Sequence, residues 1–106
     1  MSKTLYIGSD ATKNLVGDNT KARVRVGADG RTQIRFTNRT SLVNMPDDEK
    51  VVDLAVKGGG RRISLAGDLA GTLQAGDKIA LTYVKYGWYT VGTPADGQEI
   101  LGSVSK

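Results

Sequence analysis

The feature that most constrains the fold is a regular alternation of apolar and charged side chains. In residues 22–26 the apolar positions are separated by Arg23 and Arg25, and residues 31–37 alternate in the same way. Period-two alternation is typical of a strand with one buried face, because successive side chains of a strand point to opposite sides. We therefore predict two strands whose basic residues share one face.

A short Gly-Ala-Asp-Gly segment joins these two strands, which indicates a tight hairpin. A three-residue loop that ends in Gly30 supplies the left-handed position that such a turn requires. This loop length pairs Val24 with Ile34 on the core face and Arg23 with Arg35 on the other face. A slip of one residue would oppose arginines to apolar side chains, so the pattern itself favours this register.

Glycine-rich turns and further alternating runs predict several more strands. In the predicted strand over residues 50–57, Val52, Leu54 and Val56 are expected on the inner face, with Asp53 and Lys57 outside. The predicted strands beyond the hairpin cover residues 3–8, 50–57, 62–65, 78–85, 88–91 and 99–104.

One short helix is predicted, capped by Asp10 and ended by Gly17. The expected fold is all-β and mainly antiparallel, with about seven or eight short strands in a small barrel or sandwich. The length of 106 residues predicts a single β-rich domain over 1–106.

The residue inventory argues against an enzyme. The chain contains neither cysteine nor histidine, so it has no thiol nucleophile, no thiolate zinc site and no imidazole base. The acidic run Asp47-Asp48-Glu49 is expected in a turn with its carboxylates in solvent. Consecutive acids rarely converge on one ion, so no metal, cofactor or catalytic residue is predicted.

Positive charge is concentrated in the hairpin. The chain has a formal net charge of +4, and the hairpin region holds one acid, Asp29, against six basic residues. Arginine forks can grip phosphate with two hydrogen bonds, which favours a nucleic-acid surface. A solvated strand face, pairing with the acidic run, and a protein partner are the alternatives. The basic residues concerned are Lys21, Arg23, Arg25, Arg31, Arg35 and Arg39.

Two other segments extend this hypothesis. Arg61 and Arg62 follow three consecutive glycines and would lengthen a phosphate track, or would simply keep a flexible turn soluble. Four of the six aromatic residues fall within residues 83–89, beside Lys85. We expect Trp88 to be buried for packing, although it remains a candidate for stacking. The better stacking candidates are Tyr86 and Tyr89.

These observations predict a protein that binds single-stranded DNA or RNA without sequence specificity. The alternative is a structural or interaction protein, such as a virion decoration component or a small protein that docks on another and modulates it. Two copies of the chain could associate in either case. The chain lacks a signal-peptide pattern and a membrane-spanning apolar run, which favours a cytoplasmic location and no membrane partner.

Overall fold

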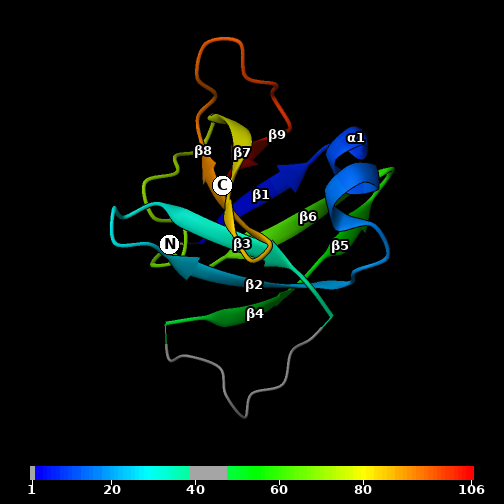
Figure 1. The fold of residues 1–106 in the computed structure, drawn as a ribbon, viewed down its shortest axis with the longest axis horizontal. Coiled ribbons are helices and arrows are strands. Elements are labelled where there is room, and N and C mark those ends of the chain that lie inside the picture. The colour runs from blue at the N-terminus through cyan, green and yellow to red at the C-terminus, as the bar shows by residue number, and fades with distance from the viewer. Residues whose placement is uncertain (1, 39–47) are drawn as a thin grey trace.

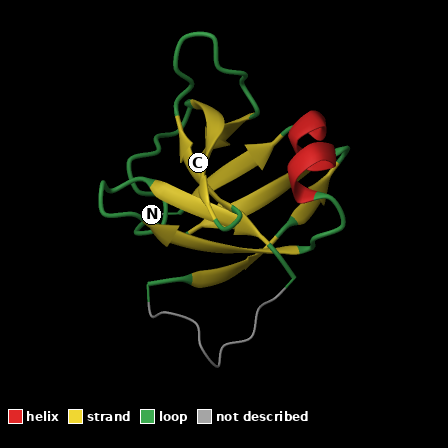
Figure 2. Ribbon diagram, viewed as in Figure 1, coloured by secondary structure: helices red, strands yellow, loops and turns green. Residues whose placement is uncertain are grey.

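The computed structural model describes residues 2–38 and 48–106, and its strands are all antiparallel (Figures 1 and 2). The strands run in the order β4-β2-β3-β8-β7-β9-β1-β6-β5. The all-β prediction is confirmed, with nine strands because the predicted strand over 50–57 is divided at Leu54. The strands are β1 (Lys3–Ile7), β2 (Lys21–Val26), β3 (Thr32–Phe36), β4 (Lys50–Asp53), β5 (Ala55–Lys57), β6 (Gly60–Leu65), β7 (Lys78–Lys85), β8 (Trp88–Gly92) and β9 (Gly102–Ser105).

The division at Leu54 closes the sheet. β4 pairs with β2, where Asp53 lies opposite Lys21, and β5 pairs with β6, where Lys57 lies opposite Gly60. The first and last strands in this order, β4 and β5, therefore belong to one stretch of chain, which is interrupted only at Leu54. The result is a nearly closed barrel, which resolves the choice between barrel and sandwich.

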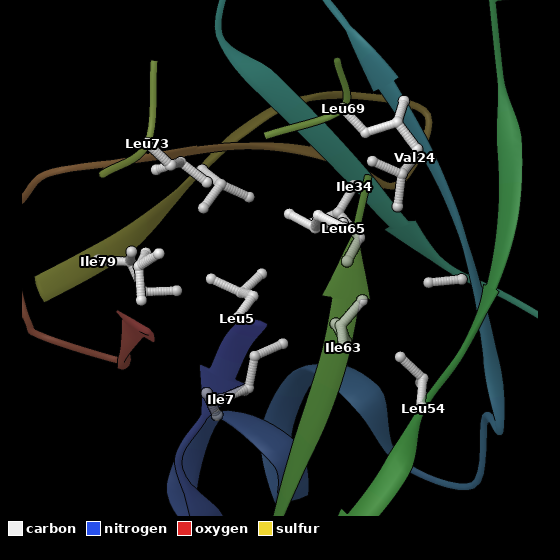
Figure 3. Close-up of a cluster of buried hydrophobic side chains, with 14 of the residues drawn as sticks. Leu5, Ile7, Val24, Ile34, Leu54, Ile63, Leu65, Leu69, Leu73 and Ile79 are labelled. Atoms are coloured by element: carbon white, nitrogen blue, oxygen red, sulfur yellow. The ribbon is translucent and has the colours of Figure 1, made fainter. Parts of the chain in front are cut away.

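The core fills this barrel with the inward-facing side chains of its strands (Figure 3). Leu5 of β1 lies opposite Ile63 of β6, Val24 of β2 lies opposite Ile34 of β3, and all four are fully buried or nearly so. Burying each aliphatic side chain of this kind contributes about 1.5–3 kcal/mol.

Helix α1 (Ser9–Ala11) continues as a π-helical turn (Thr12–Val16) and adds Ala11 and Val16 to the core. The helix ends at Gly17 as predicted, and this glycine has φ +57°. The expected cap at Asp10 is wrong, because the helix begins two residues earlier, at Ser9, with Gly8 in the capping position. The extended Gly8 is held there by a hydrogen bond from its N–H to the carbonyl of Leu101.

The hairpin register is confirmed at every position that the pattern predicted. Val24 pairs with Ile34, Ala22 with Phe36, and Arg23 with Arg35. Gly30 has φ +80°, as its place in the three-residue loop requires.

Two strand expectations are corrected. Val56, predicted on the inner face, is 70% exposed. After Leu54 the chain leaves β2 and pairs only with β6, so β5 extends the sheet where no described residue covers Val56. The last strand begins at Gly102 rather than Glu99, since the preceding Leu101 donates its N–H to Ile79 before the ladder with β1 starts.

We predict that Gly102→Ala destabilises the protein by about 2 kcal/mol or more. A Cβ at this position would overlap the backbone carbonyl of Tyr6 on β1 and push the two strands apart. Urea unfolding measures the change, and Gly92→Ala in β8 is the matched control. A Cβ on Gly92 meets no atom within 4 Å, so that variant should stay within about 0.5 kcal/mol of the parent. Equal stability of the two variants would contradict this packing.

Candidate nucleic-acid interface

Four side chains form a row across the outer face of β2, β3, β8 and β7. The ladders place Arg23 opposite Arg35, Arg35 opposite Trp88, and Trp88 opposite Lys85. The neighbours of the arginines along the strands are buried in the barrel, so the arginines themselves point outward. We call Arg23, Arg35, Trp88 and Lys85 the outer row. Neighbouring strands lie about 4.8 Å apart, so the row extends roughly 14 Å.

Glu49 neutralises part of this charge. Its Oε1 lies 2.5 Å from Nη2 of Arg23, and its Oε2 lies 3.9 Å from Nη1 of Arg25. The Glu49 side chain is only 4% exposed, so the expectation of a solvated carboxylate is wrong for this residue. Internal pairing with the acidic run, one of the alternatives, is confirmed for Arg23 and Arg25. Asp47 lies outside the described residues.

The pairing at Arg23 is incomplete. Its Nε is buried and has no hydrogen-bond partner within residues 2–38 and 48–106, and the close ion pair between its Nη2 and Glu49 Oε1 does not have hydrogen-bond geometry. One edge of this guanidinium is therefore unsatisfied. A buried donor without a partner is costly, and an anion that reached it would remove the cost.

Trp88 is buried, but outside the main core. The residue is 5% exposed and does not belong to the main core cluster, and the guanidinium carbon of Arg25 lies 3.9 Å from the centroid of its ring. Arg25 is held over the indole by a hydrogen bond from its Nε to Oε1 of Gln33, 2.8 Å long. Burial for packing is thus confirmed, and a base could stack on Trp88 only after Arg25 moved.

Of the other hairpin cations, Lys21 and Arg31 have partners at the surface, and Arg39 lies outside the described chain. Lys21 pairs with Asp53 at 2.5 Å, and Arg31 contacts Asp29 at 4.0 Å. Both pairs are solvent-exposed, and exposed pairs contribute at most about 1 kcal/mol, so a polyanion could compete with them. Arg39 lies in the segment that the structure does not describe.

Arg35 and Lys85 are the cations of the outer row that form no ion pair with any described residue. Arg35 lies along the turn of the β7–β8 hairpin, where a Cβ on Gly87 would be in van der Waals contact with its side chain. Lys85 Nζ lies 5.8 Å from the ring centroid of Tyr86, and Tyr86 is 74% exposed. At this open edge of the row, Lys85 lies beside an accessible aromatic ring and Arg35 lies along the same turn.

Three predicted site residues lie elsewhere. Arg61 and Arg62 are in β6, which pairs with β1 and β5 and not with the strands of the outer row. Arg61 donates to its neighbour's carbonyl, on Gly60. Tyr89 lies on the opposite face of the β7–β8 hairpin, where its ring contacts Phe36 and Tyr83.

Sequence reasoning considered pairing of the hairpin with the acidic run but did not single out Glu49, and it missed the contribution of Gln33. Continuing the register between β2 and β4 by one residue places Glu49 beside Arg25, which is why this acid is buried. That register joins segments separated by the undescribed residues, and nothing local in the sequence specifies it. Gln33 was foreseeable, because the hairpin register places it directly opposite Arg25.

Comparisons with known proteins add no assignment. No family model, curated protein or solved structure matches this chain. Within the described ranges, no three acidic or other metal-ligating side chains gather where they could hold an ion. None of the helices that the structure describes has the length and apolar character needed to span a bilayer.

We predict that Glu49→Gln lowers the free energy of unfolding by about 1–3 kcal/mol. The change removes the carboxylate that two half-buried guanidinium groups share, and the partial exposure of both arginines keeps the loss below that of a fully buried pair. The matched control is Asp53→Asn, whose exposed pair with Lys21 should contribute no more than about 0.5 kcal/mol. Urea unfolding followed by the fluorescence of Trp88 measures both. Similar small losses in the two variants would show that Glu49 does not organise this face.

Proposed function

We propose that the protein binds single-stranded nucleic acid, without sequence specificity, on the outer face of β2, β3, β8 and β7. The observation that carries the proposal is the concentration of guanidinium groups there. Arg23, Arg25 and Arg35 lie on two adjacent strands, and Glu49 is the one acid that pairs with them within the described chain. The face keeps a net positive charge and directs its side chains outward.

A single-stranded nucleic acid would first bind at the open edge of the outer row. Arg35 and Lys85 have no carboxylate partner among the described residues, so phosphate contacts there displace only water and counterions. The exposed ring of Tyr86 lies beside Lys85 and offers a stacking surface for a base. Stacking accepts any base, which agrees with binding that does not depend on sequence.

Contacts further along the row require rearrangement. Arg23 has an unsatisfied Nε edge, and a phosphate oxygen could bind this donor while Glu49 keeps its contact with Nη2. Arg25 could turn from Trp88 toward a phosphate and expose the indole. The fluorescence of Trp88, the single tryptophan of the chain, would then report binding directly.

We predict a salt dependence set by four cations. If Arg23, Arg25, Arg35 and Lys85 each contact a phosphate, the logarithm of the binding constant should fall with the logarithm of salt concentration with a slope of about −2 to −3. Removing two of these cations in the variant Arg35→Gln/Lys85→Gln should make the slope less negative by about 1.4. Fluorescence anisotropy of a labelled oligothymidylate at several salt concentrations measures both values.

The matched control is Arg62→Gln, which removes one charge from a strand outside the outer row. Its slope should equal that of the parent protein. A slope near zero in the parent would contradict phosphate binding. A change of about 0.7 in Arg62→Gln, half that of the double variant, would show that binding follows net charge rather than this face.

We predict that Tyr86→Leu weakens binding of the same oligonucleotide by a factor of about 5–150, which corresponds to one lost stacking contact of about 1–3 kcal/mol. Leucine keeps an apolar side chain at this position, where the backbone has φ +52°, so backbone strain is similar in both proteins. Tyr86→Phe, which keeps the aromatic ring, is the control and should leave affinity close to that of the parent. If both substitutions weaken binding equally, Tyr86 is not a specific stacking residue.

A further inference from the structure

We propose that the hollow on the other face of the β7–β8 hairpin binds a lysine or arginine side chain, presented by an extended segment of a partner protein. This hollow has a volume of about 300 Å³. It lies between α1 and its continuation, the paired strands β7 and β8, and the segment that precedes β9. Its lining residues are Asp10, Ala11, Asn14, Leu15, Leu81, Tyr83, Tyr89, Glu99 and Leu101.

Two tyrosines form one wall of the hollow. Tyr83 and Tyr89 lie opposite each other in the ladder, with ring centroids 5.5 Å apart and ring planes at 75°. The Tyr83 oxygen accepts a hydrogen bond from the N–H of Gly87, 3.3 Å away, which holds the ring across the end of the hairpin. Tyr83 is nevertheless 59% exposed. An aromatic ring that is fixed and accessible can bind a cation against its face.

Two carboxylates lie at the same hollow. Asp10 comes from α1 and Glu99 from the segment before β9, and both line the pocket. Neither forms an ion pair with any residue that the structure describes, and no lysine or arginine lines the pocket. The charged side chains of this hollow are therefore acidic, opposite in sign to the net charge of +4 that the chain carries.

The apolar lining matches the stem of a basic side chain. Leu15, Leu81 and Leu101 would contact the methylene groups of a lysine or arginine, while its charged head reaches the carboxylates and the tyrosine rings. A phosphate-bearing ligand would be repelled by the two acids. A purely apolar segment would bury the carboxylates without a partner, which is unfavourable.

The surroundings favour a peptide segment over an isolated amine. A second hollow of about 220 Å³ shares four lining residues with the first and continues past Ile100; the shared residues are Asp10, Ala11, Glu99 and Leu101. Ile100 is 58% exposed and would contact an apolar neighbour of the basic residue. The groove thus offers a cation site and, next to it, an apolar contact.

The test uses three five-residue peptides whose central residue is lysine, N-acetyl-lysine or glutamate, each flanked by leucine and glycine. Backbone amide shifts of the isotope-labelled full chain are followed by NMR during titration. We expect the lysine peptide to shift the amides of Asp10, Tyr83 and Glu99. The acetylated peptide should bind at least about fivefold more weakly, because it has lost the charge. The glutamate peptide should not bind at this site.

The variant Asp10→Asn/Glu99→Gln should lower the affinity for the lysine peptide by about tenfold or more. It should leave the affinity for the oligonucleotide unchanged, since the outer row lies on the other face. Asp96→Asn is the matched control: it removes an exposed acid from the same segment that does not line the pocket. Equal binding of the lysine and acetyl-lysine peptides, shifts confined to another surface, or full affinity in the double variant would each overturn the proposal.

Discussion

The structure depends on one stretch of chain, the segment over residues 50–57, which closes the barrel. Its first half pairs with β2 and its second half pairs with β6, so both ends of the strand order are hydrogen-bonded through the same segment. Closure leaves few unpaired strand edges and fixes which side chains face the core. The outward direction of Arg23 and Arg35 follows from this constraint. So does the burial of Glu49, which directly precedes the closing segment.

The β7–β8 hairpin connects the two candidate surfaces. Between Tyr83 and Lys85 the ladder contains a bulge, so that Tyr83 lies opposite Tyr89 while Lys85 lies opposite Trp88. One face of the hairpin therefore belongs to the basic outer row, and the other belongs to the hollow with two acids. A polyanion and a basic segment could occupy these faces together, because the sheet separates them.

Much of the fold could be predicted from local pattern. The alternation in 22–26 and 31–37, together with the Gly30 turn, was sufficient for the hairpin register. The pattern failed where the structure departs from a regular strand. Val56 has the right spacing for an inner position, but the strand loses its neighbour after Leu54 and the core does not extend that far.

The cations of the candidate site could be predicted residue by residue, whereas the acid that pairs with them was foreseen only as a member of the acidic run, as one of several alternatives. Arg23, Arg35 and Lys85 follow from charge and spacing, and the structure aligns them across four strands. The role of Glu49 depends on a long-range pairing with β2 that no local signal encodes. The same limit applies to Arg61 and Arg62, whose separation from the outer row is a property of strand order.

The most direct test of the central claim is to map the residues that a single strand contacts. An oligothymidylate of about 10 nucleotides is titrated at low salt into the isotope-labelled protein, and backbone and arginine side-chain resonances are followed by NMR. The account predicts that the largest shifts occur at Arg23, Arg35, Lys85 and Tyr86, together with a change at the indole N–H of Trp88. The absence of shifts would contradict the account, and so would shifts centred on Tyr6 of β1 and Arg62 of β6, which lie outside the outer row.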